Sequence, residues 1–186
     1  MSLSKNMRLV LCVTFAALLS FACSLTAGQA TQDGTITISP DQQELTPCAY
    51  MWASQSLPDV SEQVQAAFNT AGLSEATVRA EAYGENCVEG NGTVRSFGIM
   101  ETDFHVHIPV TDLSDRQALG DLVEKVLVVL DQFPPEVVPG PQPGHVGVEF
   151  STGQDTLNLW FTVKSGKLAR EQNLHGADLL AALNNN

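Results

Sequence analysis

The stretch from Glu101 to Val110 holds the side chains best suited to bind a ligand or a metal ion. Ionisable residues at odd positions alternate there with apolar residues at even positions: Glu101, Asp103, His105 and His107 against Phe104, Val106, Ile108 and Val110. Such a period of two predicts a strand with one face in a core. On a strand the two histidines point the same way, about 6.5–7 Å apart.

Two imidazoles at this spacing can bind Zn, Cu or Ni if a carboxylate completes the site. The sequence therefore offers a metal site of His105, His107 and Asp103, with Glu81 as the other candidate for the third ligand. Histidines that simply face solvent are the competing interpretation. Without such a metal, no cofactor is expected.

Exposed aromatic residues mixed with ionisable ones are typical of a binding surface. We expect Tyr50, Trp52, Tyr83, Asp103 and Trp160 to form one, and the same sheet face would also carry Arg79, Glu81, His105, His107 and Glu149. The alternative is that the aromatic rings pack under loops while the charged groups face water.

Catalytic motifs are weaker than this binding pattern. The sequence has no Gly-x-Ser-x-Gly elbow, no His-Glu-x-x-His and no phosphate-binding loop. Glu81, Glu85, Glu101 and Asp103 could form a glycosidase-like carboxylate pair, but an acidic protein produces such pairs by chance. We therefore assign no catalytic residue.

The N-terminus has the pattern of an export signal. Lys5 and Arg8 precede an apolar run from Leu9 to Ala22, which at about 14 residues is shorter than the roughly 20 needed to span a membrane. Residues 1–30 are predicted to be the signal peptide, and residues 31–47 a tether or edge segment.

The end of this signal has two interpretations. The stretch from Ser20 to Cys23 resembles the bacterial lipobox, which implies a lipid on Cys23, although Leu19 lies one position too early. Ordinary cleavage after Ala30 is the alternative. The protein would accordingly be secreted or held at a membrane by its lipid.

Charge narrows the range of partners. The chain has 9 basic and 21 acidic residues, and without residues 1–30 its net charge changes from −12 to −14. This argues against nucleic acid and anionic lipid as ligands. A protein or a small molecule is the expected partner.

Cysteine usage predicts one disulfide. Cys48 and Cys87 are the cysteines that lie outside the signal region, and in an exported protein they are expected to pair. Neither has a second ligand at the spacing of a zinc site.

The remaining pattern predicts one α+β domain over residues 48–186. Strands are expected at 48–54, 77–88, 93–110, 145–150 and 157–163, with a tight turn at 89–92 and a bulge near Gly98. Helices are expected at 57–71, capped by Asp59 or Ser61, and at 114–131, opened by a capping box of Ser114 and Gln117. A short C-terminal helix would cover 177–183, and residues 134–144 form a proline-rich loop.

This order of elements indicates a ferredoxin-like (split βαβ) plan, an antiparallel sheet with two main helices on one face. One conflict follows, because that plan makes the first two strands parallel and separates Cys48 from Cys87. The function expected is a non-enzymatic binding domain that uses the bare sheet face or the proline-rich loop. The alternatives are a metal-binding protein or metalloenzyme centred on His105 and His107, and an inhibitor or propeptide-like module.

Overall fold

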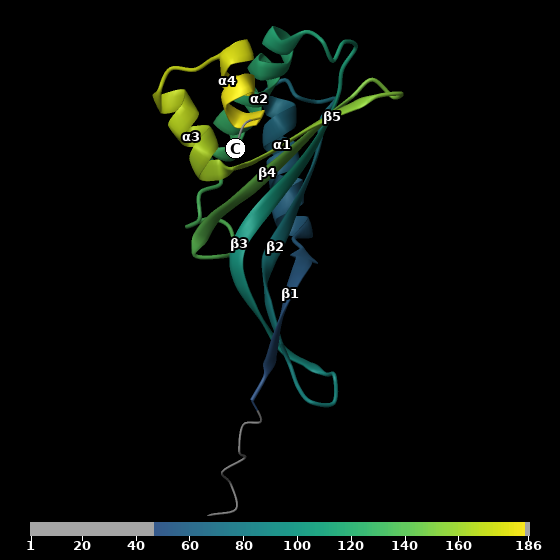
Figure 1. Cartoon of the computed structure of the whole chain (residues 1–186), viewed down its shortest axis with the longest axis vertical. Coiled ribbons are helices and arrows are strands. Elements are labelled where there is room, and N and C mark those ends of the chain that lie inside the picture. Colours follow the sequence, from purple (N-terminus) through teal and green to yellow (C-terminus); the bar gives the residue numbers. More distant parts are fainter. Residues whose placement is uncertain (1–46, 185–186) are drawn as a thin grey trace, which may run out of the picture. The chain divides into compact units, whose positions relative to one another are not determined.

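The computed structural model of the chain describes residues 47–184, within one compact unit that spans Glu44–Asn186. Its elements follow the order β1 (Ala49–Ser56), α1 (Pro58–Thr70), β2 (Thr77–Val88), β3 (Val94–Pro109), α2 (Arg116–Leu130), β4 (Gln142–Ser151), β5 (Thr156–Thr162), α3 (Val163–Glu171) and α4 (Gly176–Asn184), as Figure 1 shows. The predicted signal peptide, Cys23 and all of the predicted tether except Pro47 lie outside the described residues. None of the described helices is long and apolar enough to span a bilayer.

The fold is α+β, with one curled five-stranded sheet in the order β1-β2-β3-β4-β5. The sheet is mixed, so the prediction of an antiparallel sheet is wrong for one pair: β3 and β4 are parallel neighbours, and the other pairs are antiparallel. The parallel pair is possible because α2 lies in the long connection between β3 and β4.

The ferredoxin-like plan is not confirmed. That plan requires parallel first strands, whereas β1 runs antiparallel to β2 and pairs Tyr50 with Cys87. This register removes the conflict over the cysteines, because it brings the start of β1 to the end of β2. The predicted disulfide Cys48–Cys87 is present, with a Cα–Cα distance of 5.1 Å.

The first helix begins without the predicted side-chain cap. No side chain caps α1, and Leu57 is its N-cap residue. Ser61 instead accepts a hydrogen bond from the Ala80 N–H at 2.8 Å and donates one to the Leu57 carbonyl, so it ties α1 to β2. Gly72, with a φ of +77°, ends the helical segment where the sequence predicted a stop.

The second helix is capped one residue later than predicted. The Asp115 carboxylate accepts a hydrogen bond from the Ala118 N–H at 3.0 Å, so the predicted capping box of Ser114 and Gln117 is wrong. Ser114 donates its hydroxyl and its N–H to Asp112. Both hydrogen bonds favour the charged carboxylate and lower the pKa of Asp112.

Helix α3 was not predicted: the expected strand runs through Val163, the first residue of α3, and no element is expected over residues 164–176. Its cap is Thr162, whose hydroxyl accepts a hydrogen bond from the Ser165 N–H at 3.0 Å. Gly166 interrupts the helical pattern in sequence, yet a Cβ there would lie 2.6 Å from Leu127 Cδ2. The residue that obscures the helix in the sequence is the one that lets it approach α2.

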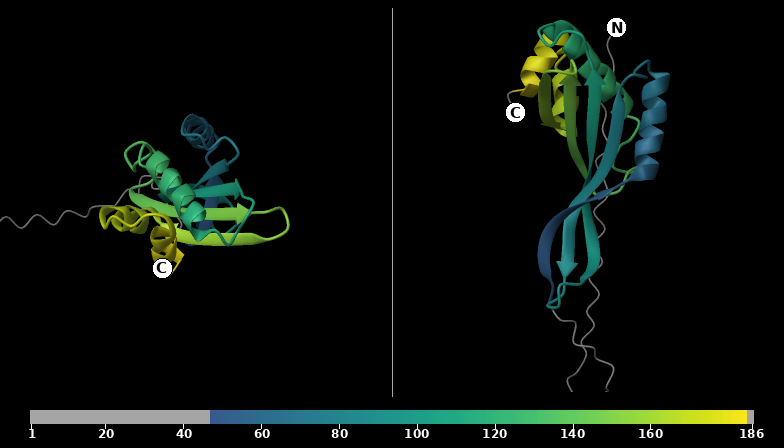
Figure 2. Two further views of the ribbon diagram at one scale, coloured as in Figure 1. Left: turned by 90° about the horizontal axis from the view of Figure 1, so that it is seen from above. Right: turned by 90° about the vertical axis from the view of Figure 1, so that its right-hand side faces the viewer.

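One hydrophobic core joins all four helices to alternate residues of β2, β3, β4 and β5. It includes Val64, Phe68, Phe104, Val106, Val123, Val126, Val148, Phe150, Phe161, Ala169, Leu179 and Leu183. Beyond the helices, β1 and the adjoining parts of β2 and β3 continue as a three-stranded ribbon (Figure 2). Apolar side chains on this ribbon stay in contact with solvent, among them Tyr50, Met51, Trp52, Val94 and Ile99.

Two bulges shape the β2–β3 ribbon around the position where one was expected. Tyr83 pairs with Glu101 but Gly84 pairs with Ile99, and Cys87 pairs with Ser96 but Val88 with Val94. The irregularities therefore flank Gly98 instead of occurring at it. Gly84 is required there, because a Cβ at this position would lie 2.0 Å from the Gly98 carbonyl oxygen.

Candidate functional site

The alternation expected in β3 is present. Phe104 and Val106 are each 2% exposed and belong to the core, while His105 and His107 are partly exposed on the opposite face of the sheet. We call this opposite face the histidine face. Its neighbours in register are Thr77, Arg79 and Glu81 of β2, His145, Gly147 and Glu149 of β4, and Asn158, Trp160 and Thr162 of β5.

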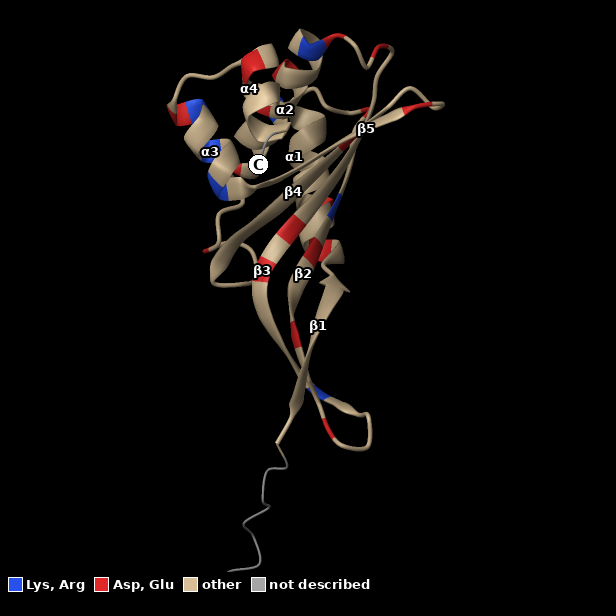
Figure 3. Ribbon diagram, in the orientation of Figure 1, with Lys and Arg blue, Asp and Glu red and all other residues tan. Residues whose placement is uncertain are grey.

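Each histidine of this face contacts a carboxylate. His105 Nε2 lies 3.5 Å from Glu81, whose other oxygen is 3.1 Å from Arg79 Nε. His107 Nδ1 lies 2.9 Å from Glu149, its register partner on β4. Figure 3 shows the acidic residues spread along β2 and β3.

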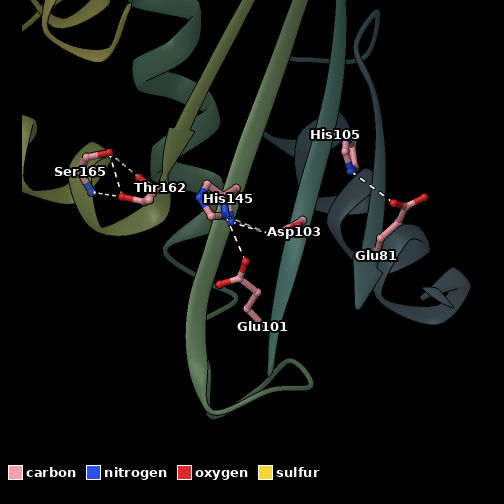
Figure 4. Close-up of polar contacts among 7 residues, drawn as sticks. All are labelled: Glu81, Glu101, Asp103, His105, His145, Thr162 and Ser165. Carbon is pink, nitrogen blue, oxygen red and sulfur yellow. Dashed lines mark hydrogen bonds and ion pairs between the residues drawn. The ribbon is translucent and has the colours of Figure 1, made fainter. Parts of the chain in front are cut away.

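The side chains of the predicted metal ligands therefore do not converge on one position. His105 and His107 face different carboxylates, and Asp103 contacts a third histidine instead. His145 Nδ1 lies 3.6 Å from Asp103 Oδ1 and 3.1 Å from Glu101 Oε1 (Figure 4). Among the described residues, Glu101, Asp103 and His145 form a group whose ligand atoms all lie within 4.8 Å of one another.

A register shift in the parallel β3–β4 pair builds this group. Thr102 pairs with Pro143 and Phe104 with Val146, so Gly144 and His145 together face Asp103. The extra residue lets the His145 N–H donate to Asp103 Oδ1 at 2.7 Å. Gly144 admits the carboxylate, since a Cβ there would lie 2.6 Å from Asp103 Oδ1 and 2.1 Å from the Thr102 oxygen. Bulges recur where a sheet must re-aim a side chain.

Trp160 of the edge strand β5 is an exposed aromatic residue of the histidine face, and its ring reaches over β4. Its ring is stacked on His145, with centroids 5.4 Å apart and planes at 11°, and it lies 5.6 Å from the ring of His105. The ring crosses Gly147, where a Cβ would be 2.6 Å from Trp160 Cζ3. The absence of a side chain at position 147 is what allows this position of the ring.

A hollow of about 500 Å³ opens beside Trp160. Strands β2 to β5 line it, with Thr77, Arg79, His105, His107, Glu149, Asn158 and Trp160 as its polar and aromatic groups. It thus combines a cation, a carboxylate, an amide, imidazoles and a flat ring, in a volume that suits a small ligand or a side chain of a partner.

Other predicted binding residues lie elsewhere on the sheet. Trp52 stacks on Tyr83, with centroids 5.4 Å apart, and pairs in register with Glu85. Glu85 is six residues along β2 from Arg79, a distance of about 20 Å on a strand. Tyr50, 70% exposed, lies still farther along β1. The structure does not bring these three aromatic residues to Trp160.

Sequence reasoning missed three residues of this region: His145, Glu101 as a partner of that histidine, and Gly147. The alternation of β4 already pointed His145, Gly147 and Glu149 to one side. The sequence does not show that β4 lies beside β3, nor that the register of this pair shifts at Asp103.

A second hollow, of about 460 Å³, lies beneath the proline-rich loop. It is mostly apolar, with Phe104, Leu130, Phe133, Pro134, Pro135, Val138 and Val163 in its wall. Lys164 and Lys167 of α3 also line it. The loop that the sequence singled out for binding therefore covers a cavity of its own.

Comparison of the chain with models of protein families, with curated proteins and with solved structures found no match.

Proposed function

We propose that this protein is an exported, non-enzymatic binding domain that recognises its ligand in the hollow beside Trp160. The observation that carries the proposal is Trp160 itself. This tryptophan is 49% exposed, its ring lies over Gly147, and it lines a cleft of about 500 Å³. A large aromatic ring left exposed costs solvation free energy, and such rings are enriched where partners bind.

The groups on the histidine face support the same function. The core unites the helices with the Phe104 and Val106 side of the sheet, and we infer that the histidine face stays free for a partner. The exposed Arg79 guanidinium, with 61% of its side chain accessible, and the Asn158 amide lie in the same hollow. A ligand that stacks on Trp160 would find both hydrogen-bond donors and a carboxylate there.

Export is the location we propose for this binding. The disulfide Cys48–Cys87 is consistent with an oxidising compartment, and the charge and apolar pattern of residues 1–30 favour passage through a membrane. The domain would then be secreted, or tethered to a membrane through a lipid on Cys23.

Capture of a partner from envelope extract tests the function. Immobilised wild-type protein should retain a protein or small molecule that Trp160→Ala loses, because the substitution removes the stacking surface. Leu168→Ala is the matched control: Leu168 is an apolar residue of α3, 52% exposed, and lies outside the lining of this hollow. Retention by this control and loss by Trp160→Ala would support the proposal.

The identity of the captured partner separates the remaining alternatives. A protease held by the wild type and inhibited by it would favour an inhibitor-like module. Equal retention by wild type and Trp160→Ala would show that the hollow is not the binding site. A partner lost only by substitutions at Phe133 or Lys167 would move the site to the cavity beneath the proline-rich loop.

A further inference from the structure

We propose that Glu101, Asp103 and His145 bind a divalent transition-metal ion, with Zn²⁺ as the expected metal. The ligand atoms would be Glu101 Oε1, Asp103 Oδ1 and His145 Nδ1. This site differs from the pair of histidines that the sequence singled out.

The distances fit one shared ion. Zinc takes imidazole nitrogen at about 2.0–2.1 Å and carboxylate oxygen at about 2.0–2.2 Å, usually with tetrahedral geometry. Two ligand atoms of one tetrahedron are then about 3.3–3.5 Å apart. His145 Nδ1 lies 3.1 Å from Glu101 Oε1 and 3.6 Å from Asp103 Oδ1, and the whole group spans less than 4.8 Å.

The three side chains are held in place before any ion binds. The bulge at Gly144 and His145 aims the imidazole at Asp103, and the His145 N–H fixes that carboxylate at 2.7 Å. Stacking on Trp160 orients the imidazole ring. Contacts that orient metal ligands in this way raise affinity, because less freedom is lost on binding.

Burial and charge favour a cation at this point. The Glu101 and Asp103 side chains are 16% and 12% exposed, so both carboxylates are largely removed from water, and they share one imidazole as ion-pair partner. The imidazole is 33% exposed, which leaves a side from which an ion and its remaining water ligands can enter. One nitrogen and two oxygens suit Zn²⁺ better than Ca²⁺ or Mg²⁺, which select oxygen ligands.

The histidine face supplies its own matched control. His107 and Glu149 form a histidine–carboxylate contact of 2.9 Å on the same two strands, but with one carboxylate instead of two. If exposed histidines on an acidic protein were sufficient for binding, this pair would bind the metal equally well.

Calorimetric titration with Zn²⁺ tests the site on the full chain, purified with a tag that contains no histidine. Wild type should bind one ion. Glu101→Gln, Asp103→Asn and His145→Gln should each weaken affinity at least about tenfold, the loss seen when even an outer contact of a metal site is removed. Glu149→Gln and His107→Gln should stay within about twofold of wild type. Asp103→Asn keeps an acceptor for the His145 N–H, so this variant should retain its fold. Circular dichroism in the presence of a chelator checks that each variant is folded without the metal.

Nuclear magnetic resonance identifies the ligand directly, because the chain has only four histidines. Zn²⁺ should shift the ring ¹⁵N signals of His145 and leave those of His107 in place. The proposal is overturned if wild type binds no Zn²⁺ at millimolar concentration, if the control variants lose as much affinity as Glu101→Gln, or if Ca²⁺ binds more tightly than Zn²⁺. Asn158→Ala distinguishes the two proposals, because Asn158 lines the hollow and is not among the three metal ligands. Loss of partner capture by this variant, with the Zn²⁺-induced shift of the His145 ring unchanged, would concern the hollow alone.

Discussion

At the scale of single residues, Gly147 determines where Trp160 can lie. A Cβ at position 147 would come within 2.6–2.7 Å of two ring carbons of Trp160, so Gly147→Ala must push the ring off β4. Because Trp160 is 49% exposed, the ring can move away at a cost near the lower end of overpacking, about 1 kcal/mol. The indole ring would leave its position over β4 while the fold remains.

Tryptophan fluorescence measures this displacement in a Trp52→Phe background, where Trp160 is the remaining indole. Gly147→Ala should shift the emission to longer wavelength, because the ring leaves His145 and enters solvent. Gly90→Ala is the control, since a Cβ there meets nothing within 4 Å. An unchanged spectrum for Gly147→Ala would show that the ring is not held across this glycine.

Part of the histidine face could be predicted from these residues and part could not. The alternation of β3 fixes the side to which His105 and His107 point, since a strand has a strict period of two. Their partners depend on register: Glu149 reaches His107, and His145 reaches Asp103, only because β4 lies beside β3 with one residue inserted. No local pattern encodes that neighbour, so the predicted metal ligands, His105 and His107 with Asp103 or Glu81, all lie on β2 and β3 and include no residue of β4.

At the scale of elements, the sequence predicted the limits of single strands and turns better than it predicted which strands lie side by side in the sheet. The limits of β2 agree with the prediction, and the turn at Glu89 to Gly92 is present, with the Gly92 N–H donating to the Glu89 carbonyl at 2.8 Å. The strand limits and the turn depend on residues that are close together in the chain. The strand order depends on which apolar faces pack together, and the same succession of strands and helices is compatible with more than one sheet.

The contact between α2 and α4 provides a test at this scale. A Cβ on Gly120 would lie 1.8 Å from the Gly176 carbonyl oxygen, so the backbones of the two helices approach as closely as glycine allows. Helix propensity alone would make Gly120→Ala more stable by about 1 kcal/mol. Since the obstacle is backbone and cannot rotate away, we expect an overpacking cost of about 3 kcal/mol or more. After the gain in helix propensity is subtracted, a net destabilisation of about 2 kcal/mol remains.

Urea unfolding measures the sign of this effect. Val128→Ala in the same helix is the control, because Val128 is 52% exposed and exposed substitutions stay within about 0.5 kcal/mol. A Gly120→Ala variant as stable as wild type would mean that α4 can move away from α2 at no cost.

At the scale of the whole described unit, stability is distributed unevenly along the sheet. Strands β4 and β5 contribute Val146, Val148, Phe150, Leu159 and Phe161 to the core, whereas seven of the eight residues of β1 are exposed. Burial therefore contributes little to holding β1, and its attachment depends on pairing with β2 and on the disulfide Cys48–Cys87.

Removal of the disulfide should accordingly act first on the ribbon. The bond joins residues 39 apart, which the chain-entropy model equates with about 4 kcal/mol of global stability. In the Cys48→Ser, Cys87→Ser variant, hydrogen exchange should accelerate in β1 and in β2 from Gly84 to Val88, because β1 can separate without opening the core. Exchange in β4 and β5 should stay slow under native conditions, since their amides open only with the core. Equal acceleration in all five strands would mean instead that the sheet opens as one cooperative unit. Interactions other than the disulfide would then hold β1 to the sheet.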